Sequence, residues 1–301
     1  MSEPIVSVIL ASYGRESWLH QTLCDVVAQL PEWAEVLVIN QSASDSFERS
    51  RAYISALNEA RITQYSCPKG LPGARNMGIE KSRAPVLIFF DDDVRLHEGC
   101  IQAHLDTHAQ PGIGGVVGRI VEHVVQSNSD KVRNSVGING RVRCNLDGDG
   151  FGYVDSLTGA NMSIKRAVFE QIGPFDSNYL GTAVLEESDV SIRMRRAGWR
   201  IGFQPAASLE HFSASEGGVR VGDALRTQRW RFHNAAYYVR QHHGLLAWPA
   251  LSSTFLAIAL KHALRWRKPT AVLRLMRALG QGWKLGEVSP DRTPFTPLQT
   301  R

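Results

Sequence analysis

Three adjacent carboxylates are the residues in this chain most clearly suited to chemistry. The apolar run VLIFF at residues 86–90 leads directly into Asp91, Asp92 and Asp93. Two unit charges about 5 Å apart repel by roughly 3 kcal/mol at an effective dielectric near 20, so such a cluster costs stability unless a positive charge offsets it. A single aspartate suffices to cap a helix. The triplet therefore favours a bound cation over the alternative, a cap followed by solvated surface acids.

A second acidic group lies in the segment LEESDVSIR at residues 185–193. On a helix Glu186 and Asp189 would share one face, while Glu187 would point about 100° away. Carboxylates held in two directions are candidates for a general base. The alternative is structural, because acids in a first helical turn interact favourably with the helix macrodipole without any catalysis.

The elements that must position these groups follow from apolar periodicity. Short β-branched runs predict buried strands, and helical spacing of Leu19, Leu23 and Val26 predicts a helix after the first of them. Ser44 or Asp45 is expected to cap a second helix. The predicted strands occupy residues 5–10, 36–39, 62–65 and 86–90. This strand-helix alternation is typical of a parallel sheet covered by helices on both faces.

Polar segments follow three of the predicted strands, where ligands bind in such sheets. They are ASYGRES at residues 11–17, NQSASD at residues 40–45 and the aspartate triplet. No GxGxxG follows the first strand and no GxxxxGK[ST] occurs, so dinucleotide and P-loop sites are disfavoured. A nucleotide site with carboxylates and no glycine cradle indicates phosphates held through a divalent metal.

Five segments together resemble the family 2 glycosyltransferases of the GT-A fold. They are VSVILASYGRESWLHQTL, KGLPGARNMGIEKSRAPVLIFFDDDV, LTGANMSIKRAVFEQIGPFDSNY, LEESDVSIRMRRAGWRI and LEHF, and they span roughly residues 5–212. The resemblance implies an α/β fold with a Rossmann-like, mainly parallel sheet. It also implies an enzyme that transfers a sugar, with inversion, from a nucleotide diphosphate carrier.

The resemblance assigns the aspartate triplet to the DxD motif of that family. Asp91 would lie near the ribose of the donor, and Asp93, with Asp91, would bind Mg²⁺ or Mn²⁺. His211, in ASLEHF, would complete the metal sphere, since neutral imidazole suits Mn²⁺ beside carboxylates. A purely structural histidine is the alternative.

The same resemblance indicates the general base. The usual run in the family is Glu-Asp-x-Asp and its second residue is the base, which corresponds to Glu187 here. Glutamate in place of aspartate adds one methylene and changes the reach of the carboxylate. Glu186 and Asp189 therefore stay open as alternatives.

Donor-binding residues are likewise implied by the resemblance. Arg75, in KGLPGARNMG, would pair with phosphate or else form a surface ion pair. Asn40 and Gln41 stand where relatives carry an aspartate for the base, and Asp45 either serves that purpose or caps a helix. The full set is Ala11, Ser12, Tyr13, Arg15, Asn40, Gln41, Asp45, Gly70, Arg75, Asn76, Asp91, Asp92, Gly159 and Asn161.

Three further segments complete the expected catalytic region. The small residues at 158–163, which include Gly159 and Asn161, would lie behind the donor sugar, before a helix that starts near Lys165. The polar, glycine-rich residues 127–150 predict a loop over the site. Trp199 is expected to pack in the core rather than to stack on a ligand.

Charge is unevenly distributed along the 301 residues, whose net charge is +5. Residues 224–286 contain no acid and eleven basic residues, so the rest of the chain is net negative. The 17-residue apolar stretch 244–260 is short for crossing a bilayer of about 30 Å hydrocarbon thickness. We expect an interfacial helical element on anionic lipid, to which Leu275, Leu279 and Trp283 add apolar contact. The alternative is a helical cap packed on the catalytic domain.

Cysteine usage suggests the compartment. The four cysteines are scattered, and no basic region precedes the first apolar run, which favours a reducing cytosol without a secretory signal. We expect a catalytic domain at residues 1–223 and a basic helical region at residues 224–301, peripheral on the cytoplasmic face of the inner membrane.

The function expected from the sequence is hexosyltransferase-like transfer in cell-surface glycan synthesis. The expected partners are a nucleotide-diphospho-sugar, a lipid-linked or polysaccharide acceptor and an anionic membrane surface, and no nucleic acid. Two alternatives belong to other classes. A sugar-phosphate nucleotidyltransferase needs a glycine-rich basic signature after its first strand, and a catalytically inactive lipid-bound scaffold would not need both acidic clusters.

Overall fold

The first half of the catalytic region alternates strands with helices, as its periodicity predicts. The computed structural model describes residues 3–122, 132–212, 214, 223–287 and 290. Its first elements are β1 (Val6–Ser12), α1 (Glu16–Gln29), β2 (Ala34–Asn40), α2 (Ser44–Ala56), β3 (Ile62–Ser66), α3 (Leu71–Lys81) and β4 (Val86–Asp91). These four strands pair in parallel in the order β3-β2-β1-β4. All four predicted strands and both predicted helices are confirmed.

The second half of the catalytic region completes the sheet with strands of both directions. It contains β5 (Val94–Leu96), α4 (Cys100–His108), β6 (Ile113–Glu122), β9 (Gly152–Val154), β10 (Asn161–Lys165), α5 (Arg166–Ile172), α6 (Glu186–Arg196) and β11 (Arg200–His211). Strand β10 is antiparallel to both β4 and β6, whereas β11 is parallel to β6. Strands β1 to β4 and the β6–β11 pair are thus parallel, as expected of a mainly parallel sheet, and β5, β9 and β10 are its antiparallel members. Met162 pairs with Phe89 across a long stretch of chain, so the tertiary path, and not the local sequence, sets the direction of β10.

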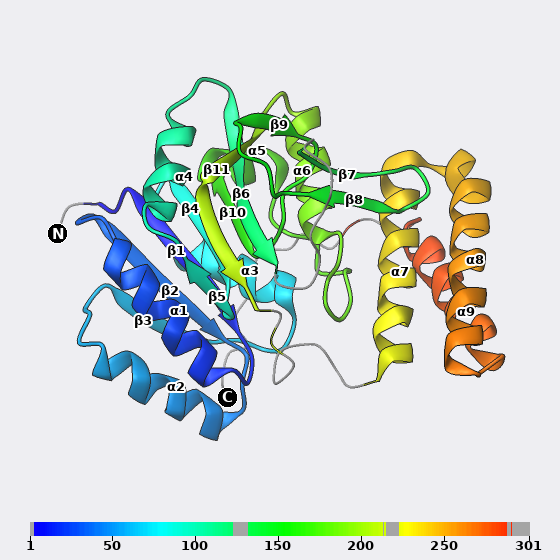
Figure 1. The fold of residues 1–301 in the computed structure, drawn as a ribbon, viewed down its shortest axis with the longest axis horizontal. Helices are drawn as coiled ribbons and strands as arrows, with labels where there is room; N and C mark the ends of the chain where they lie inside the picture. The colour runs from blue at the N-terminus through cyan, green and yellow to red at the C-terminus, as the bar shows by residue number, and fades with distance from the viewer. Residues whose placement is uncertain (1–2, 123–131, 213, 215–222, 288–289, 291–301) are drawn as a thin grey trace.

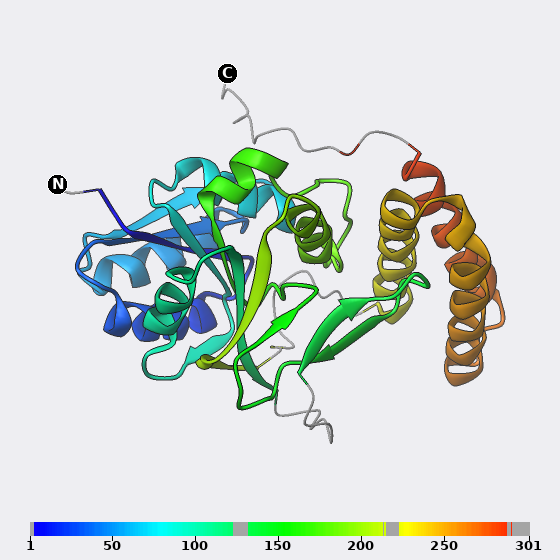
Figure 2. The same ribbon diagram turned by 90° about the horizontal axis from the view of Figure 1, so that it is seen from above.

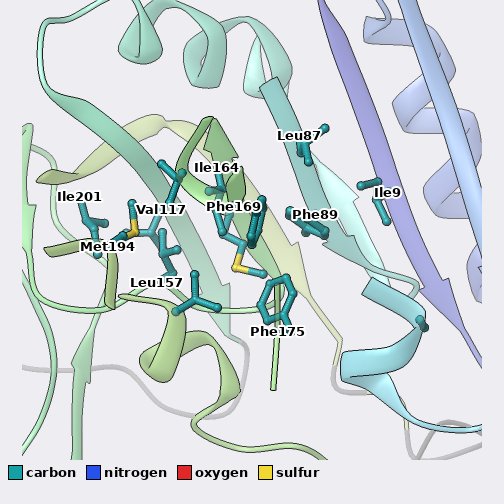
Figure 3. Close-up of a cluster of buried hydrophobic side chains, with 14 of the residues drawn as sticks. Ile9, Leu87, Phe89, Val117, Leu157, Ile164, Phe169, Phe175, Met194 and Ile201 are labelled. Atoms are coloured by element: carbon teal, nitrogen blue, oxygen red, sulfur yellow. The ribbon is translucent and has the colours of Figure 1, made fainter. Parts of the chain in front are cut away.

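Helices cover both faces of the sheet, as expected (Figure 1). Helices α1 and α4 bury Leu19, Leu23 and Ile101 against one face. Helices α3, α5 and α6 cover the other face, where the side chains in Figure 3 interdigitate. Helix α3 approaches β1 closely at Gly78, where a Cβ atom would lie 2.5 Å from Ile9 Cγ2. The core therefore holds the strand ends of both halves in one rigid frame.

The basic C-terminal region folds into three helices beside the sheet (Figure 2). They are α7 (Ala224–His243), α8 (Trp248–Trp266) and α9 (Thr270–Leu285), with a 3₁₀ turn (Leu245–Ala247) between the first two. Their core includes Tyr179, Ala183 and Leu185 of the catalytic region. Leu275 and Leu279 are buried among these helices, and the Trp283 ring packs tilted against Trp248, with ring centroids 4.6 Å apart. The expectation of lipid contact is therefore wrong for Leu275 and Leu279, whereas for the half-buried Trp283 it stays a prediction.

The apolar helix in this region is longer than the 17 residues counted from sequence. In the described part of the chain, Leu245–Trp266 is long and apolar enough to cross a membrane, and only 22% of its most apolar window is buried. A core helix of a soluble protein passes the same test of length and composition. Leu256, Leu260 and Leu264 on its outer face are 42%, 50% and 80% exposed. An unpartnered apolar face therefore lies on this helix.

The expected loop over the site is largely a hairpin. Residues 127–131 lie outside the described part, but β7 (Arg133–Val136) and β8 (Val142–Asn145) form an antiparallel pair. Figures 1 and 2 show this hairpin reaching toward α7 and α8. Gly140 at its turn has φ 72°, and a Cβ atom there would lie 3.1 Å from Leu251 Cδ1. The hairpin thus packs on the C-terminal helices, because the glycine turn lets it approach them closely.

Candidate active site

A small cavity opens where β1, β4 and β11 end. Its volume is about 150 Å³, and parallel pairing places Ala11 beside Asp91 at its edge. The residues that line it are Ala11, Tyr13, Arg15, Gln41, Leu71, Asp91, Asp92, Asp93, Thr182 and His211. Eight of the positions expected to bind the donor or the metal, including Asp93, therefore line this cavity. Leu71 and Thr182 were not predicted from the sequence, although Thr182 lies just before the acidic segment.

Asp91, Asp93 and His211 form a cluster that could hold a metal ion. One ligand atom from each lies within 4.8 Å of the others. His211 Nε2 is 3.3 Å from Asp93 Oδ1 and 3.7 Å from Asp91 Oδ2. Burial acts to raise the pKa of Asp93, but His211 and Arg15 outweigh it and hold that pKa below its ordinary value. Two carboxylates with one imidazole are a donor set that suits Mn²⁺ or a similar divalent ion.

The middle aspartate of the triplet has a different environment. Asp92 accepts a hydrogen bond from Ser12 Oγ at 2.7 Å and one from Arg15 at 3.1 Å. Arg15 also lies 2.9 Å from Asp93 and donates to the carbonyl of Ala214. Burial raises the pKa of Asp92 to about 6. Ser12 and Arg15 thus fix the position of Asp92, and the Arg15 guanidinium offsets part of the charge of the triplet.

Arg75 connects the two acidic clusters. Its guanidinium contacts Glu186 and lies 3.7 Å from Asp91 Oδ1, and its side chain is 4% exposed. It also donates to the Gly159 carbonyl at 3.2 Å, where a Cβ atom would lie 2.4 Å from Arg75 Nη2. Residue 159 must be small for this contact. Arg75 therefore forms a buried ion pair, and not the surface pair that was the alternative to phosphate binding.

The first two acids of α6 differ in access. Burial raises the pKa of Glu186 to about 8, although the Arg75 guanidinium opposes that rise. Glu187 is half-buried, whereas the Glu186 side chain is 1% exposed. Burial also raises the pKa of Glu187; Arg75 opposes the rise, and the charge of Asp91 adds to it. Glu187 is thus the more accessible of the two carboxylates, within the electrostatic field of the strand-end cluster.

The third acid of this helix is structural. Both oxygens of Asp189 are bonded: Arg193 Nε lies 2.9 Å from Oδ2, and His242 Nε2 lies 2.8 Å from Oδ1. Arg196 approaches His242 Nδ1 and can only donate, so Nδ1 accepts and Nε2 carries the proton. The His242 side chain is 3% exposed and packs against α6. Asp189 has no free oxygen to act as a base.

Two of the expected donor-binding asparagines are buried in structural networks. The Asn76 amide donates to the Phe175 carbonyl and accepts from its N–H, both at 2.9 Å. Asn161 donates to the carbonyls of Arg119 and Ala207, and its Oδ1 lies 2.9 Å from His104 Nε2. Neither amide is left to face a ligand. Their polar side chains suggested ligand binding, but both are buried and hydrogen-bonded within the protein.

Turns position the residues that were expected to contact the nucleobase. Asn40 Oδ1 accepts from the Ser42 N–H at 2.9 Å, so this buried side chain closes a turn after β2. Gln41 Oε1 accepts from the Gly70 N–H at 2.7 Å and fixes the start of α3. Asp45 is exposed in the first turn of α2, whose N-cap is Ala43. Neither Ser44 nor Asp45 therefore caps that helix.

Local contacts place Trp199 in the core and Tyr13 at the cavity. Trp199 packs against the core and donates to Gln171 Oε1 at 2.8 Å, which confirms its structural role. Tyr13, which lines the cavity, lies under the Lys69 ammonium at 3.9 Å from the ring centroid. Lys69 directly precedes Gly70 and was not predicted from the sequence, because nothing distinguishes it from a solvated surface lysine.

The sheet and its strand-end cluster define a glycosyltransferase of the GT-A fold class. The profile of the family described as glycosyl transferase family 2 matches residues 7–173. The chain belongs to that family, as the five segments suggested.

Relatives with known structures or functions are consistent with this assignment. The chain is 25% identical over 218 residues to the "Glucosyl-dolichyl phosphate glucuronosyltransferase" of Haloferax volcanii, covering 68% of each protein. The solved structure of GalNAc-T7 with UDP, GalNAc and Mn²⁺ matches with TM-score 0.65 and 18% identity, over 80% of this chain and 48% of that one. The mannosyltransferase PcManGT from Pyrobaculum calidifontis, with GDP-Man and Mn²⁺, matches with TM-score 0.58 and 14% identity, over 94% and 88%. At these identities the two structures support the fold alone.

Proposed function

We propose that this protein transfers a sugar, with inversion, from a nucleotide-diphosphate donor to an acceptor hydroxyl in cell-surface glycan synthesis. The observation that carries the proposal is the convergence of two clusters at one edge of the sheet. Asp91, Asp93 and His211 would hold a divalent ion, and Glu187 stands on a helix tied to Asp91 through Arg75 and Glu186. Donor site and base would thus be held in fixed relation.

The bonding changes fit one base and one leaving group. The acceptor oxygen attacks C1 of the donor sugar from the face opposite the diphosphate, and its proton passes to Glu187. The new C1–O bond forms as the C1–O bond to phosphate breaks, and the nucleoside diphosphate leaves with the electron pair. A Mn²⁺ or Mg²⁺ ion bound by Asp91, Asp93 and His211 would neutralise charge on the diphosphate. Arg15 lines the same cavity, and Lys69 adds positive charge beside it, over the ring of Tyr13.

We assign the acceptor to lipid-linked glycans or polysaccharides. The name of the Haloferax relative specifies a dolichyl phosphate-linked sugar as its acceptor. The apolar outer face of α8, with Leu256, Leu260 and Leu264 exposed, and the basic residues of the C-terminal region suit an anionic membrane surface. The protein would then lie on the cytoplasmic face of the inner membrane, where nucleotide sugars are available.

A thermal-shift panel of nucleotide sugars with Mn²⁺ tests the proposal. A ligand at about 100 times its dissociation constant adds roughly 2.7 kcal/mol to the free energy of unfolding. One donor class should raise the melting temperature in Mn²⁺ and lose most of that effect in EDTA or in Asp93→Asn. Equal shifts with and without metal would remove the metal role.

The two alternative classes give different results in simple assays. A sugar-phosphate nucleotidyltransferase would release pyrophosphate from a nucleoside triphosphate, and membership in family 2 argues against that activity. An inactive scaffold would bind the donor without turnover. Slow hydrolysis of the donor that is lost in Glu187→Gln would exclude the scaffold.

A further inference from the structure

A second cavity, of about 510 Å³, lies between the catalytic region and the C-terminal helices. Three structural units line it: the hairpin turn before β8, the segment just before α6, and the facing sides of α7 and α8. Its lining residues are Gly140, Arg141, Val142, Val184, Leu185, Gln228, Arg231, Phe232, Ala235, Phe255, Ile258 and His262. The cavity is therefore distinct from the strand-end cavity that contains the aspartate triplet.

One short segment forms a wall of both cavities. Thr182 lines the strand-end cavity, while Val184 and Leu185 line the second one. The next residues are Glu186 and Glu187, at the start of α6. A molecule in the second cavity would therefore contact the segment that leads directly into the helix of the proposed base. The acceptor has to reach that base to lose its proton.

The lining of the second cavity has two chemical characters. Phe232, Phe255 and Ile258 provide apolar walls on α7 and α8, whereas Arg141 and Arg231 carry positive charge. None of the described residues that line it is acidic. An apolar body with an anionic group would complement such walls, since burying the chain is favourable and arginine binds phosphate through several N–H groups.

Further basic residues on α8 flank this cavity without lining it. Burial lowers the pKa of His262, and the charges of Arg265, Lys261 and Arg231 lower it further. Helical geometry of about 100° per residue places Lys261 and Arg265 between His262 and the exposed leucines of α8. Lys261 and Arg265 would thus add positive charge beside the cavity, while the leucines face away from it.

Contacts between the surrounding elements fix the positions of the cavity walls. Asn139 Nδ2 donates to Thr254 Oγ1 at 3.4 Å, and Gly140 packs against Leu251 and Phe255. On the other side, the Trp230 ring lies where a Cβ atom at Gly181 would be, 2.1 Å from Trp230 Cδ2. These contacts fix the hairpin and α7 relative to the segment that precedes Glu186.

We propose that this cavity binds the acceptor, and that the acceptor is a phosphate-bearing lipid: its chain lies against Phe232, Phe255 and Ile258, and its phosphate is bound by Arg231 and Arg141. This assignment rests on the proposed glycosyl transfer, since it names the substrate of the same site. The sugar carried on the phosphate would then extend past Leu185 toward Glu187.

Binding of octyl phosphate to the full-length protein, below its micelle concentration, tests the assignment by calorimetry. Octyl phosphate should bind at one saturable site. Octanol and inorganic phosphate should each bind at least about tenfold more weakly. Each of these two controls retains only one half of the proposed recognition. Equal binding of octanol would overturn the role of the arginines, and equal binding of phosphate would overturn that of the apolar walls.

Matched variants locate the site. Ile258→Trp should fill the cavity and lower octyl phosphate affinity about tenfold, whereas Ala257→Trp, at an exposed neighbouring position, should leave it unchanged. Arg231→Ala should weaken binding, and Arg229→Ala, exposed on another side of α7, should not. Arg231 is exposed, so its variant stays informative even if Ile258→Trp melts at a lower temperature. Unchanged affinity in both Ile258→Trp and Arg231→Ala would refute the assignment.

Donor binding in the same variants separates this inference from the proposed function. Nucleotide-sugar shifts with Mn²⁺ should persist in Ile258→Trp and Arg231→Ala, because neither residue lines the strand-end cavity. If donor binding is intact and the affinity for octyl phosphate is the same in the variants, only this inference is overturned. Normal octyl phosphate binding without any donor binding would overturn the proposed function.

Discussion

His242 Nε2 lies 2.8 Å from Asp189 Oδ1 and joins the last turn of α7 to the helix that carries Glu187. Removing this donor leaves a buried carboxylate oxygen without its partner, which costs about 1–3 kcal/mol. His242→Ala should therefore lower the free energy of unfolding by about that amount, and His243→Ala should lower it less. Urea denaturation measures both. Equal losses would mean that the pair adds no specific stability.

Removing residues 224–301 should destabilise the catalytic region. Tyr237 Oη donates to Asp176 at 2.6 Å, and Asn234 bonds to both the N–H and the carbonyl of Leu180. These bonds fix the segment before α6, and the sequence alone did not indicate them. We expect residues 1–223 to lose cooperative thermal unfolding, whereas a chain ending after α9 should keep it. A cooperative melt of residues 1–223 near the full-length temperature would contradict this.

Glu187 should set the acidic limb of the pH–rate profile. A base must be deprotonated to act, and burial raises the pKa of Glu187 above its ordinary value of 4.5. Turnover should thus fall with decreasing pH at values above 4.5. Glu187→Gln should lower turnover about a hundredfold or more with donor affinity unchanged. If Glu186→Gln alone removes the limb, the base is Glu186.

Arg75→Lys should impair catalysis more than folding. A lysine ammonium cannot contact Glu186, Asp91 and the Gly159 carbonyl at once, because it lacks the planar fork of arginine. A shift of about 1 Å in a catalytic group can cost about a hundredfold in rate, so we expect a loss of roughly that size in kcat. Arg83→Lys, which alters an exposed pair with Glu35, is the control. An unchanged kcat would mean that the bridge is not needed for alignment.

The exposed leucines of α8 should carry the apolar part of membrane binding. Changing Leu256, Leu260 and Leu264 to serine should weaken sedimentation with anionic vesicles, since each buried CH₂ is worth about 0.8 kcal/mol. Salt at about 1 M should weaken but not eliminate binding of the unchanged chain. Ile5→Ser with Trp33→Ser, exposed far along the sequence from α8, should have no effect. Equal vesicle binding by all variants would indicate a solvated face.

Two buried histidines should make stability depend on pH. Burial lowers the pKa of His104 to about 4 and that of His108 to about 3, whereas an unfolded histidine titrates near 6.5. Between pH 6.5 and about 4 the unfolded chain binds more protons, so stability falls as pH falls through this window. His108→Gln can keep a donor to Ser163 and should reduce the slope by about one proton. A slope equal to that of the unchanged chain would exclude His108.

The sequence by itself determined the local elements and the chemical class of the site. The runs at residues 5–10 and 86–90 predicted buried strands, which β1 and β4 confirm, and the placement of Asp91 and Asp93 directly after the second of them predicted carboxylates at the edge of the sheet. Such features depend on period and on neighbours in the chain. The order of the five segments likewise sufficed to identify the family.

Tertiary structure decided which polar side chains face the ligand. Asn76 and Asn161 have the same side chain as residues that bind nucleotides, but each amide is used up by partners far along the chain. The Arg75–Glu186 contact spans 111 residues and the Asp189–His242 contact spans 53. Burial and pairing at such separations depend on how helices and strands pack together, and no local pattern in the sequence encodes that packing.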